Sequence, residues 1–236
     1  MNLSKDLVPI IRKKEMDKEA TNFLKKYCPE ALEKPMAVPV EDIAEFKMHL
    51  GIDYVNINKN CDVLGMMIFS DGPVELYDKN IDKYIRRDYI KGTLLVEKDL
   101  SETSNRGRER FTIAHEMVHW DKHQLRFMAL FYKDKITAKA YRSSQEKIYN
   151  PKTPEEWMEW QADNLAAAIL MPADMFKLKS EELKIKQQAS EEINGFMRRG
   201  FGSGNSRDFI IDELASTFQV SKQAAMIRIN TLKINI

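Results

Sequence analysis

The hydrophobic positions along the chain change their period several times, and each change marks an expected element. Apolar residues recur at helical spacing within residues 14–27 and again within residues 41–50, with prolines between the two stretches. Beyond them, short apolar runs bounded by turn residues replace the helical spacing. These runs predict strands at residues 53–58, 63–69, 74–77 and 93–97. The first part of the chain therefore predicts two helices followed by a small sheet.

Helical spacing returns after the polar loop SETSN at residues 101–105. Asn105 is a residue type that caps helices, and apolar residues follow it at intervals of three and four. Pro154 opens another helix, which ends at Pro172 because proline lacks the backbone donor that a helix needs. A charged stretch at residues 178–193 predicts a further helix, and a glycine-rich loop separates it from a compact helical region at the end of the chain.

The composition restricts the classes of protein that this sequence fits. In 236 residues, 37 Lys and Arg nearly balance 36 Asp and Glu, so no overall charge attracts the molecule to nucleic acid or to an anionic membrane. No apolar run approaches the roughly 18 residues that a membrane span needs, and the first residues lack a signal-peptide pattern. We therefore expect a cytoplasmic protein. Cys28 and Cys61 are expected to be reduced thiols and not metal ligands.

The candidate chemistry lies in the stretch FTIAHEMVHWDKH at residues 111–123. On a helix, His115 and His119 lie one turn apart on the same face, so both imidazoles reach one metal ion. Glu116 lies about 100° round the helix, beside that ion. This is the HExxH arrangement of zinc peptidases, in which zinc takes three protein ligands and leaves the fourth position for water. The sequence must therefore supply a third ligand.

His123 continues the spacing of four, but it is a poor third ligand. Eight residues of helix rise about 12 Å, which is too far for His115 and His123 to share one ion. We expect His123 at the surface or in the outer shell of the site. The longer motif HExxHxxGxxH is also excluded, because Lys122 and Leu125 occupy its glycine and third histidine positions.

A later helix offers carboxylates at the right spacing for the third ligand. Glu159 and Asp163 lie four residues apart, so Glu159 would bind the metal while Asp163 accepts the free ring N–H of a histidine ligand. Glu155 and Glu159 have the same spacing, however, so spacing alone also allows the pair to begin one turn earlier. Alanines at 162, 166 and 167 would let this helix approach the first one closely.

These residues resemble the ImmA/IrrE family of zinc metallo-endopeptidases. The resemblance rests on RERFTIAHEMVH at residues 108–119, on EWQAD at 159–163 and on the LMP that follows at 170–172. It departs from the family at residues 117–118, where Met-Val replaces the common Leu-Gly, and in the long separation between the two motifs. It implies zinc ligands His115, His119 and Glu159, a catalytic Glu116, and a helix-turn-helix transcriptional repressor as the substrate.

The resemblance also implies a fold class and a division of the chain. We expect an α+β, zincin-like protein of the gluzincin type, with a small sheet, the HExxH helix and the helix bearing Glu159. Residues 1–58 would be a helical segment that packs on the core, residues 59–176 the core itself, and residues 177–236 a helical subdomain with a pattern like a helix-turn-helix unit.

Three points stay open at this stage. The polar insert at about residues 138–154 connects the two motif helices and is expected to cover the active-site groove as a lid, with a solvated connection as the alternative. The residue that stabilises the oxyanion is one of Tyr132, Tyr141, Tyr149 and His123.

The competing hypothesis is that the chain is a DNA-binding or regulatory protein that retains the metal fold. It rests on the last helices, which resemble a helix-turn-helix unit. The basic excess there is small, because residues 195–236 contain six Lys and Arg against three Asp and Glu.

Overall fold

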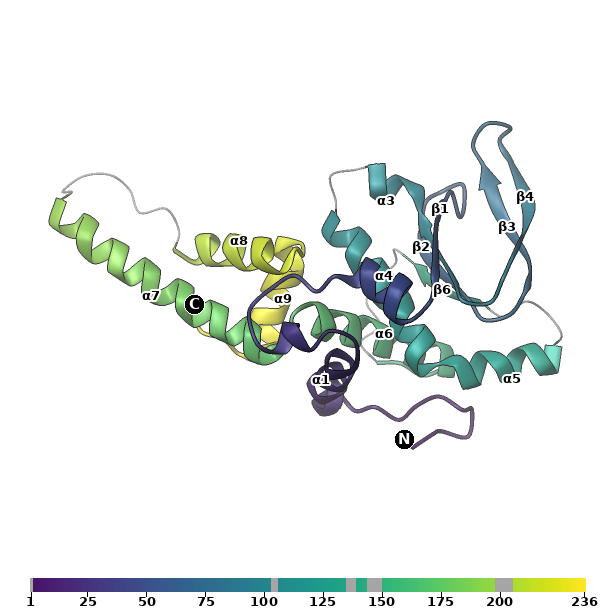
Figure 1. The fold of residues 1–236 in the computed structure, drawn as a ribbon, viewed down its shortest axis with the longest axis horizontal. Coiled ribbons are helices and arrows are strands. Elements are labelled where there is room, and N and C mark those ends of the chain that lie inside the picture. The colour runs from purple at the N-terminus through teal and green to yellow at the C-terminus, as the bar shows by residue number, and fades with distance from the viewer. Residues whose placement is uncertain (1, 103–105, 135–138, 144–149, 198–205) are drawn as a thin grey trace.

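The protein has an α+β fold, as the sequence predicts, with one four-stranded sheet, a separate hairpin and a larger helical part (Figure 1). The computed structural model describes residues 2–102, 106–134, 139–143, 150–197 and 206–236. Within those ranges, no helix is long and apolar enough to cross a membrane.

The larger sheet has the strand order β1-β5-β2-β6. Its strands are β1 (Gly51–Val55), β2 (Val63–Ile68), β5 (Thr93–Glu97) and β6 (Lys139–Ser143). β1 and β5 are parallel, whereas β2 is antiparallel to both β5 and β6. From Met66 to Ile68 the side chains alternate across β2, so that Met67 joins the core under the helices while Met66 and Ile68 join a smaller cluster under the hairpin. Leu64 also joins the larger core, next to a register shift between Val63 and Gly65. The sheet therefore lies between the helices and the hairpin.

Two of the strands were not expected from the hydrophobic pattern. The hairpin pairs β3 (Gly72–Asp78) with β4 (Lys83–Tyr89). The sequence KYIRRDY of β4 has no apolar alternation because this strand is exposed along nearly its whole length. The other strand, β6, lies inside the insert that was expected to have no regular structure, and this expectation was wrong for residues 139–143. Residues 138 and 144–149 of the predicted lid lie outside the described part of the chain, and residues 150–153 lead into the next helix.

The helices follow the predicted pattern with small differences. Their bounds are η1 Lys13–Glu15, α1 Met16–Tyr27, η2 Pro29–Leu32, α2 Val40–Asp42, η3 Ile43–Lys47, α3 Lys98–Glu102, α4 Arg106–Lys122, α5 Gln124–Asp134, α6 Pro154–Leu170, α7 Ala173–Met197, α8 Ser206–Phe218 and α9 Lys222–Leu232. α3 includes the first two residues, 101–102, of the expected polar loop. α6 begins where Thr153 accepts a hydrogen bond from Glu156 N and Glu156 reaches back to the backbone, which is a capping box.

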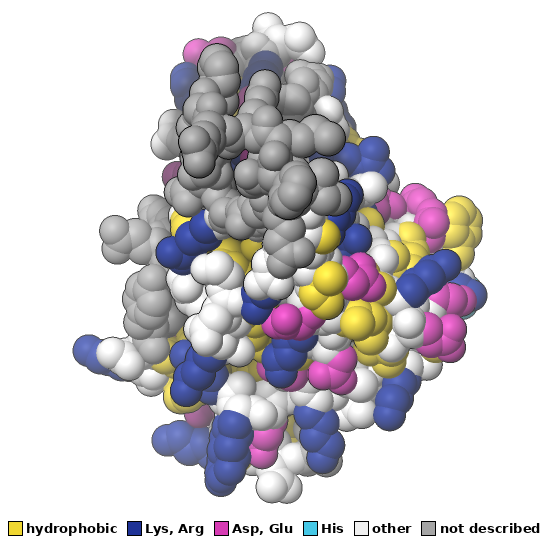
Figure 2. Space-filling model, turned by 90° about the vertical axis from the view of Figure 1, so that its left-hand side faces the viewer, with side chains coloured by type: hydrophobic (Ala, Val, Ile, Leu, Met, Phe, Trp, Pro, Cys, Tyr) yellow, Lys and Arg dark blue, Asp and Glu magenta, His cyan; other side chains and the backbone are white. Residues whose placement is uncertain are grey.

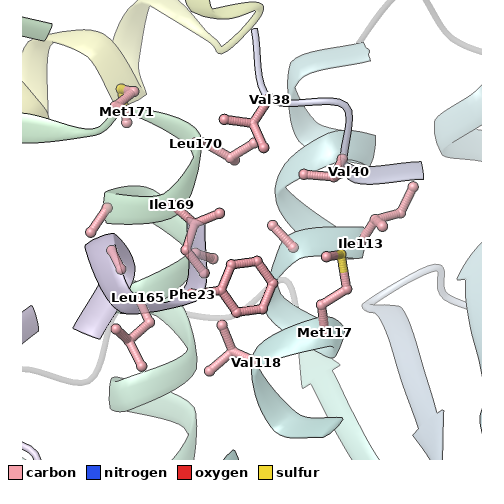
Figure 3. Close-up of a cluster of buried hydrophobic side chains, with 14 of the residues drawn as sticks. Phe23, Val38, Val40, Ile113, Met117, Val118, Leu165, Ile169, Leu170 and Met171 are labelled. Carbon is pink, nitrogen blue, oxygen red and sulfur yellow. The ribbon is translucent and has the colours of Figure 1, made fainter. Parts of the chain in front are cut away.

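The core between α4 and α6 brings the two motif helices together. Phe23 of α1 packs with Met117 and Val118 of α4 and with Leu165 and Ile169 of α6 (Figure 3). Alanines of α6 that are fully buried against this core, Ala162 and Ala166, let the two helices approach closely. The side chains that face this core are thus held on a rigid, close-packed frame.

The C-terminal helices also pack onto this frame. A Cβ atom on Gly107 of α4 would lie 2.8 Å from the backbone nitrogen of Ser221, in the turn between α8 and α9. Arg110, almost fully buried, donates from Nε to the carbonyl of Gln219 at 3.2 Å and from Nη2 to that of Val38 at 2.6 Å. Arg228 of α9 donates to the carbonyl of Met171 at 3.0 Å. One hydrophobic cluster includes residues from all three predicted segments, and their division into domains stays a prediction.

Candidate metal centre

Three side chains from α4 and α6 converge on one point. His115 and His119 lie one turn apart on α4, and their Nε2 atoms are 3.0 Å apart. The carboxylate of Glu159 on α6 reaches both of them, with Oε2 3.2 Å from His115 Nε2 and Oε1 3.1 Å from His119 Nε2. Both histidines are fully buried, whereas Glu159 is partly exposed. The structure therefore brings together the three residues that the sequence predicts as ligands.

The spacing of these atoms fits a tetrahedral ion. Ligand atoms bound at about 2.0–2.1 Å to a tetrahedral zinc ion lie roughly 3.3 Å from one another. The two imidazole nitrogens here lie 3.0 Å apart, and each has one oxygen of the Glu159 carboxylate at 3.1 to 3.2 Å. Two imidazole nitrogens and a carboxylate oxygen form a donor set typical of a catalytic zinc site, so the residues present fit such an ion.

Asp163, one turn beyond Glu159, contacts the far side of the first histidine. Its Oδ1 lies 3.0 Å from Nδ1 of His115. Burial alone would lower the pKa of His115, but the hydrogen bonds to Asp163 and Glu159 outweigh burial and raise that pKa to about 9. Burial would raise the pKa of Glu159, yet the two histidines hold it below its ordinary value. Asp163 thus occupies the orienting position that the spacing indicated.

Glu155, the alternative ligand, points elsewhere. Its Oε1 accepts a hydrogen bond from Arg126 Nη2 at 2.8 Å, and 58% of its side chain is exposed. The structure therefore places the second member of the Glu155/Glu159 pair at the histidines and the first at the surface. Spacing alone did not distinguish them, because the choice depends on how α6 is rotated against α4.

His123 lies in the outer shell of the site and not at the surface. It is fully buried, and its Nδ1 lies 2.9 Å from Nδ1 of His119. The surface half of the expectation was wrong: His123 keeps the helical spacing, with its N–H donating to the carbonyl of His119 at 2.9 Å, and its ring lies behind that of His119. Burial, followed by the neighbouring His119, lowers the pKa of His123 to about 3.

The structure narrows the set of residues proposed to stabilise an oxyanion. Tyr132 on α5 is exposed over 72% of its surface. His123 contacts the face of His119 opposite the metal position. Tyr141 belongs to β6, and its side chain is not described, while Tyr149 lies outside the described residues. The set of candidate oxyanion donors therefore shrinks to the tyrosines.

A second group of possible ligands lies apart from this centre. Cys61 Sγ lies 3.4 Å from Oδ2 of Asp99, and the buried Glu97 completes the group. Lys79 Nζ already contacts Asp99 at 2.6 Å, and the carboxylate of Glu97 accepts hydrogen bonds from two groups near β1. These partners satisfy the charges without an ion.

Gly65, which the sequence pattern did not single out, lies beside the candidate site. It lies on β2 opposite the fully buried Glu116, and a Cβ atom added to it would lie 2.9 Å from Glu116 Oε1 and 2.6 Å from Thr112 Cγ2. An isolated glycine inside a strand pattern signals such a close approach, and VLGMMIF contains one.

We expect Gly65→Ala to displace the carboxylate of Glu116. The added Cβ atom would clash with Thr112 Cγ2 as well as with Glu116, and Thr112 is β-branched and stiff in a helix, so β2 and α4 must move apart and Glu116 must shift with them. The substitution should lower peptide hydrolysis about 10-fold or more at full metal content, and such overpacking costs typically about 1–3 kcal/mol of stability. Turnover, metal content and urea unfolding measure the three effects. Gly51→Ala in β1 is the matched control, because nothing lies within 4 Å of its added Cβ atom. Equal turnover of the two variants would contradict the role given to Gly65.

Comparison with known proteins decides the family. The family model described as the IrrE N-terminal-like domain, Peptidase_M78, matches residues 61–230, which is well over half of the chain. The chain belongs to the ImmA/IrrE family. As a Peptidase_M78 protein it is a metallopeptidase, and the family assignment drawn from the two motifs is confirmed. The matched region of this ImmA/IrrE protein includes α4, α6 and most of the C-terminal helices. A search of curated proteins finds no match to the chain.

Proposed function

We propose that this metallopeptidase is a zinc-dependent endopeptidase of the gluzincin type. The observation that carries the proposal is the convergence of His115, His119 and Glu159 from two packed helices onto one point. Structural zinc sites close with four protein ligands, whereas catalytic sites use three and keep one position for water. The group at this point in the described residues contains three ligands, which favours a catalytic role.

The residues around the site have distinct tasks in hydrolysis. Bound zinc supplies a Lewis acid that lowers the pKa of a coordinated water from 15.7 to about 7. Glu116 would accept a proton from the attacking water, and that proton would then pass to the leaving amine as the C–N bond breaks. Asp163 would hold His115 in the tautomer that leaves Nε2 free to bind a metal.

The proposed substrate is a helix-turn-helix transcriptional repressor in the cytoplasm, where Cys28 and Cys61 stay as the free thiols that the structure contains. The substrate segment must be extended to enter the site. β6 is one of the two edge strands of the described sheet and lies against α4. Its free edge offers backbone groups that an extended peptide could pair with.

A DNA-binding role for the C-terminal helices has less support. The turn between α8 and α9 lies against Gly107, and Arg228 of α9 is buried, where it contacts Met171 and Asp17. On the face that Figure 2 shows, Lys and Arg side chains alternate with Asp and Glu, and the described residues there form no continuous basic area. These features favour a packing role for α8 and α9.

Incubation with the repressor encoded beside its gene tests this function. We expect the zinc-loaded protein to cut the repressor into a small number of fragments with new amino termini, as measured by mass spectrometry. Removal of zinc by a chelator should stop cleavage, and added zinc should restore it. An intact repressor in the presence of fully zinc-loaded protein would refute the proposed substrate, while cleavage that survives complete zinc removal would refute the proposed chemistry.

A further inference from the structure

A continuous chain of hydrogen bonds extends from the far side of His119 to the amino-terminal arm, residues 2–12. His119 Nδ1 lies 2.9 Å from His123 Nδ1, and His123 Nε2 lies 3.1 Å from Oε1 of Gln161 on α6. Gln161 Nε2 then donates to the carbonyl of Pro9 at 2.6 Å. All three side chains are buried to within 1% of their surface, so water does not compete for these bonds.

The chemistry of the end groups fixes the direction of every bond. His119 presents Nε2 to the metal position, so as a neutral ligand it carries its proton on Nδ1. His123 Nδ1 must then accept a hydrogen bond from His119 Nδ1–H. The neutral His123 ring therefore carries its own proton on Nε2, which donates to the amide oxygen of Gln161. The amide nitrogen of Gln161 in turn donates to the carbonyl of Pro9, which can only accept. Each donor in the chain thus meets one acceptor, and the Pro9 carbonyl ends it.

We infer that His123 and Gln161 are positioning residues that hold His119 in its metal-binding tautomer and orientation, with the amino-terminal arm as the fixed end of the chain. This inference rests on the proposed zinc site and names the support of one of its ligands. The two histidine ligands are then held differently: His115 by the carboxylate of Asp163, and His119 by a neutral ring and a neutral amide.

There is a physical reason for supporting His119 with neutral groups and not with a carboxylate. Glu159, Asp163 and Glu116 already provide three carboxylates from the two motif helices. A further carboxylate behind His119 would add negative charge to the ion's surroundings and weaken its action as a Lewis acid. A histidine and a glutamine orient the ring without that charge.

Contacts within the amino-terminal arm hold the Pro9 carbonyl, the last acceptor of the hydrogen-bond chain, in place. Ser4 closes a turn by accepting Asp6 N and Val8 N on its hydroxyl, each at 3.2 Å, and by donating its backbone N–H to the carbonyl of Val8 at 2.8 Å. Val8 and Ile11 are buried on either side of Pro9. The carbonyl of Pro9 is therefore presented to Gln161 by a folded turn with apolar anchors.

Paired substitutions at His123 test the inference. Leucine removes the acceptor for His119 Nδ1, and we expect zinc affinity to fall about 10–100-fold, as for other outer-shell partners of zinc ligands. Asparagine keeps an oxygen near the position of Nδ1, and it should restore most of the affinity. His49→Asn, an exposed histidine with a backbone φ of 56° that asparagine tolerates, is the matched control and should leave affinity unchanged.

Two measurements that need no turnover complete the test. Zinc affinity is measured by competition with a chromophoric chelator, and long-range ¹H–¹⁵N spectra report the tautomers of the four histidines. We expect His123 protonated on Nε2 in the zinc-loaded protein. Equal losses in His123→Leu and His123→Asn, or a His123 proton on Nδ1, would overturn the inference. A wild-type protein that binds no zinc would instead overturn the proposed function.

A second position keeps the test valid if His123→Leu does not fold. Gln161→Met preserves the length of the side chain but removes both the acceptor for His123 and the donor to Pro9. It should lower zinc affinity several-fold and allow the His123 ring to change tautomer. Unchanged affinity together with an unchanged tautomer would show that the chain does not support His119.

Discussion

Glu116→Gln is expected to abolish hydrolysis while the metal and the fold remain. The amide has the size of the carboxylate, so it fits the buried space beside Gly65, but it cannot accept a proton from water. General acid–base catalysis contributes typically about 10²–10⁴-fold, and we expect a loss of at least that size in kcat/KM. The measurement is cleavage of the repressor or of a derived peptide, with zinc content and urea unfolding recorded on the same samples.

The control is Glu155→Gln, the same chemical change at an exposed glutamate of α6. It should leave kcat/KM within the scatter of the wild type. If Glu116→Gln keeps its turnover at full zinc occupancy, another group acts as the base and the mechanism proposed above is wrong. If it loses zinc as well, Glu116 helps to hold the metal site together.

Glu159→Ala is expected to cause the largest loss of zinc. It removes the one charged ligand of three and leaves two neutral imidazoles for a divalent ion. The affinity should fall by more than the about 10–100-fold that loss of an outer-shell partner costs. Zinc titration against a chelator of known affinity gives the number, and metal analysis after dialysis gives the occupancy.

Glu155→Ala again provides the comparison, because the two glutamates are one turn apart on the same helix. It removes a partly exposed ion pair with Arg126, and such pairs are worth roughly 0–1 kcal/mol. Its zinc affinity should match that of the wild type. Comparable zinc binding by Glu159→Ala and the wild type would remove Glu159 from the ligand set and leave the site without its third ligand.

The sequence was most informative where all the residues of a pattern lie on one helix. α4 follows from apolar spacing after Asn105, and α6 from helical spacing between Pro154 and Pro172, and both signals are local. The pair His115 and His119 follows in the same way, because a spacing of four residues fixes their relation on any helix. The helical part of the fold and half of the candidate site were therefore predictable from short stretches of sequence.

The remainder depends on contacts between distant segments. The choice of Glu159 over Glu155 depends on the rotation of α6 against α4, and only the family resemblance indicated it. The buried His123 contacts Gln161 of α6, 38 residues away. β6 gains its structure by pairing with β2, since its own sequence has no strand pattern. The spacing of residues within a short stretch of sequence does not predict such contacts between distant segments.

The main-chain carbonyl of Pro9 gives the amino-terminal arm an unusual mutational profile. No side-chain substitution removes a backbone carbonyl, so an alanine scan through the arm would pass over its contact with Gln161. Insertion or deletion of a single residue between Ser4 and Pro9 would instead move that carbonyl out of register with α6. In a mutational library, the exposed positions of the arm should therefore tolerate changes of residue, whereas the arm should reject changes of length.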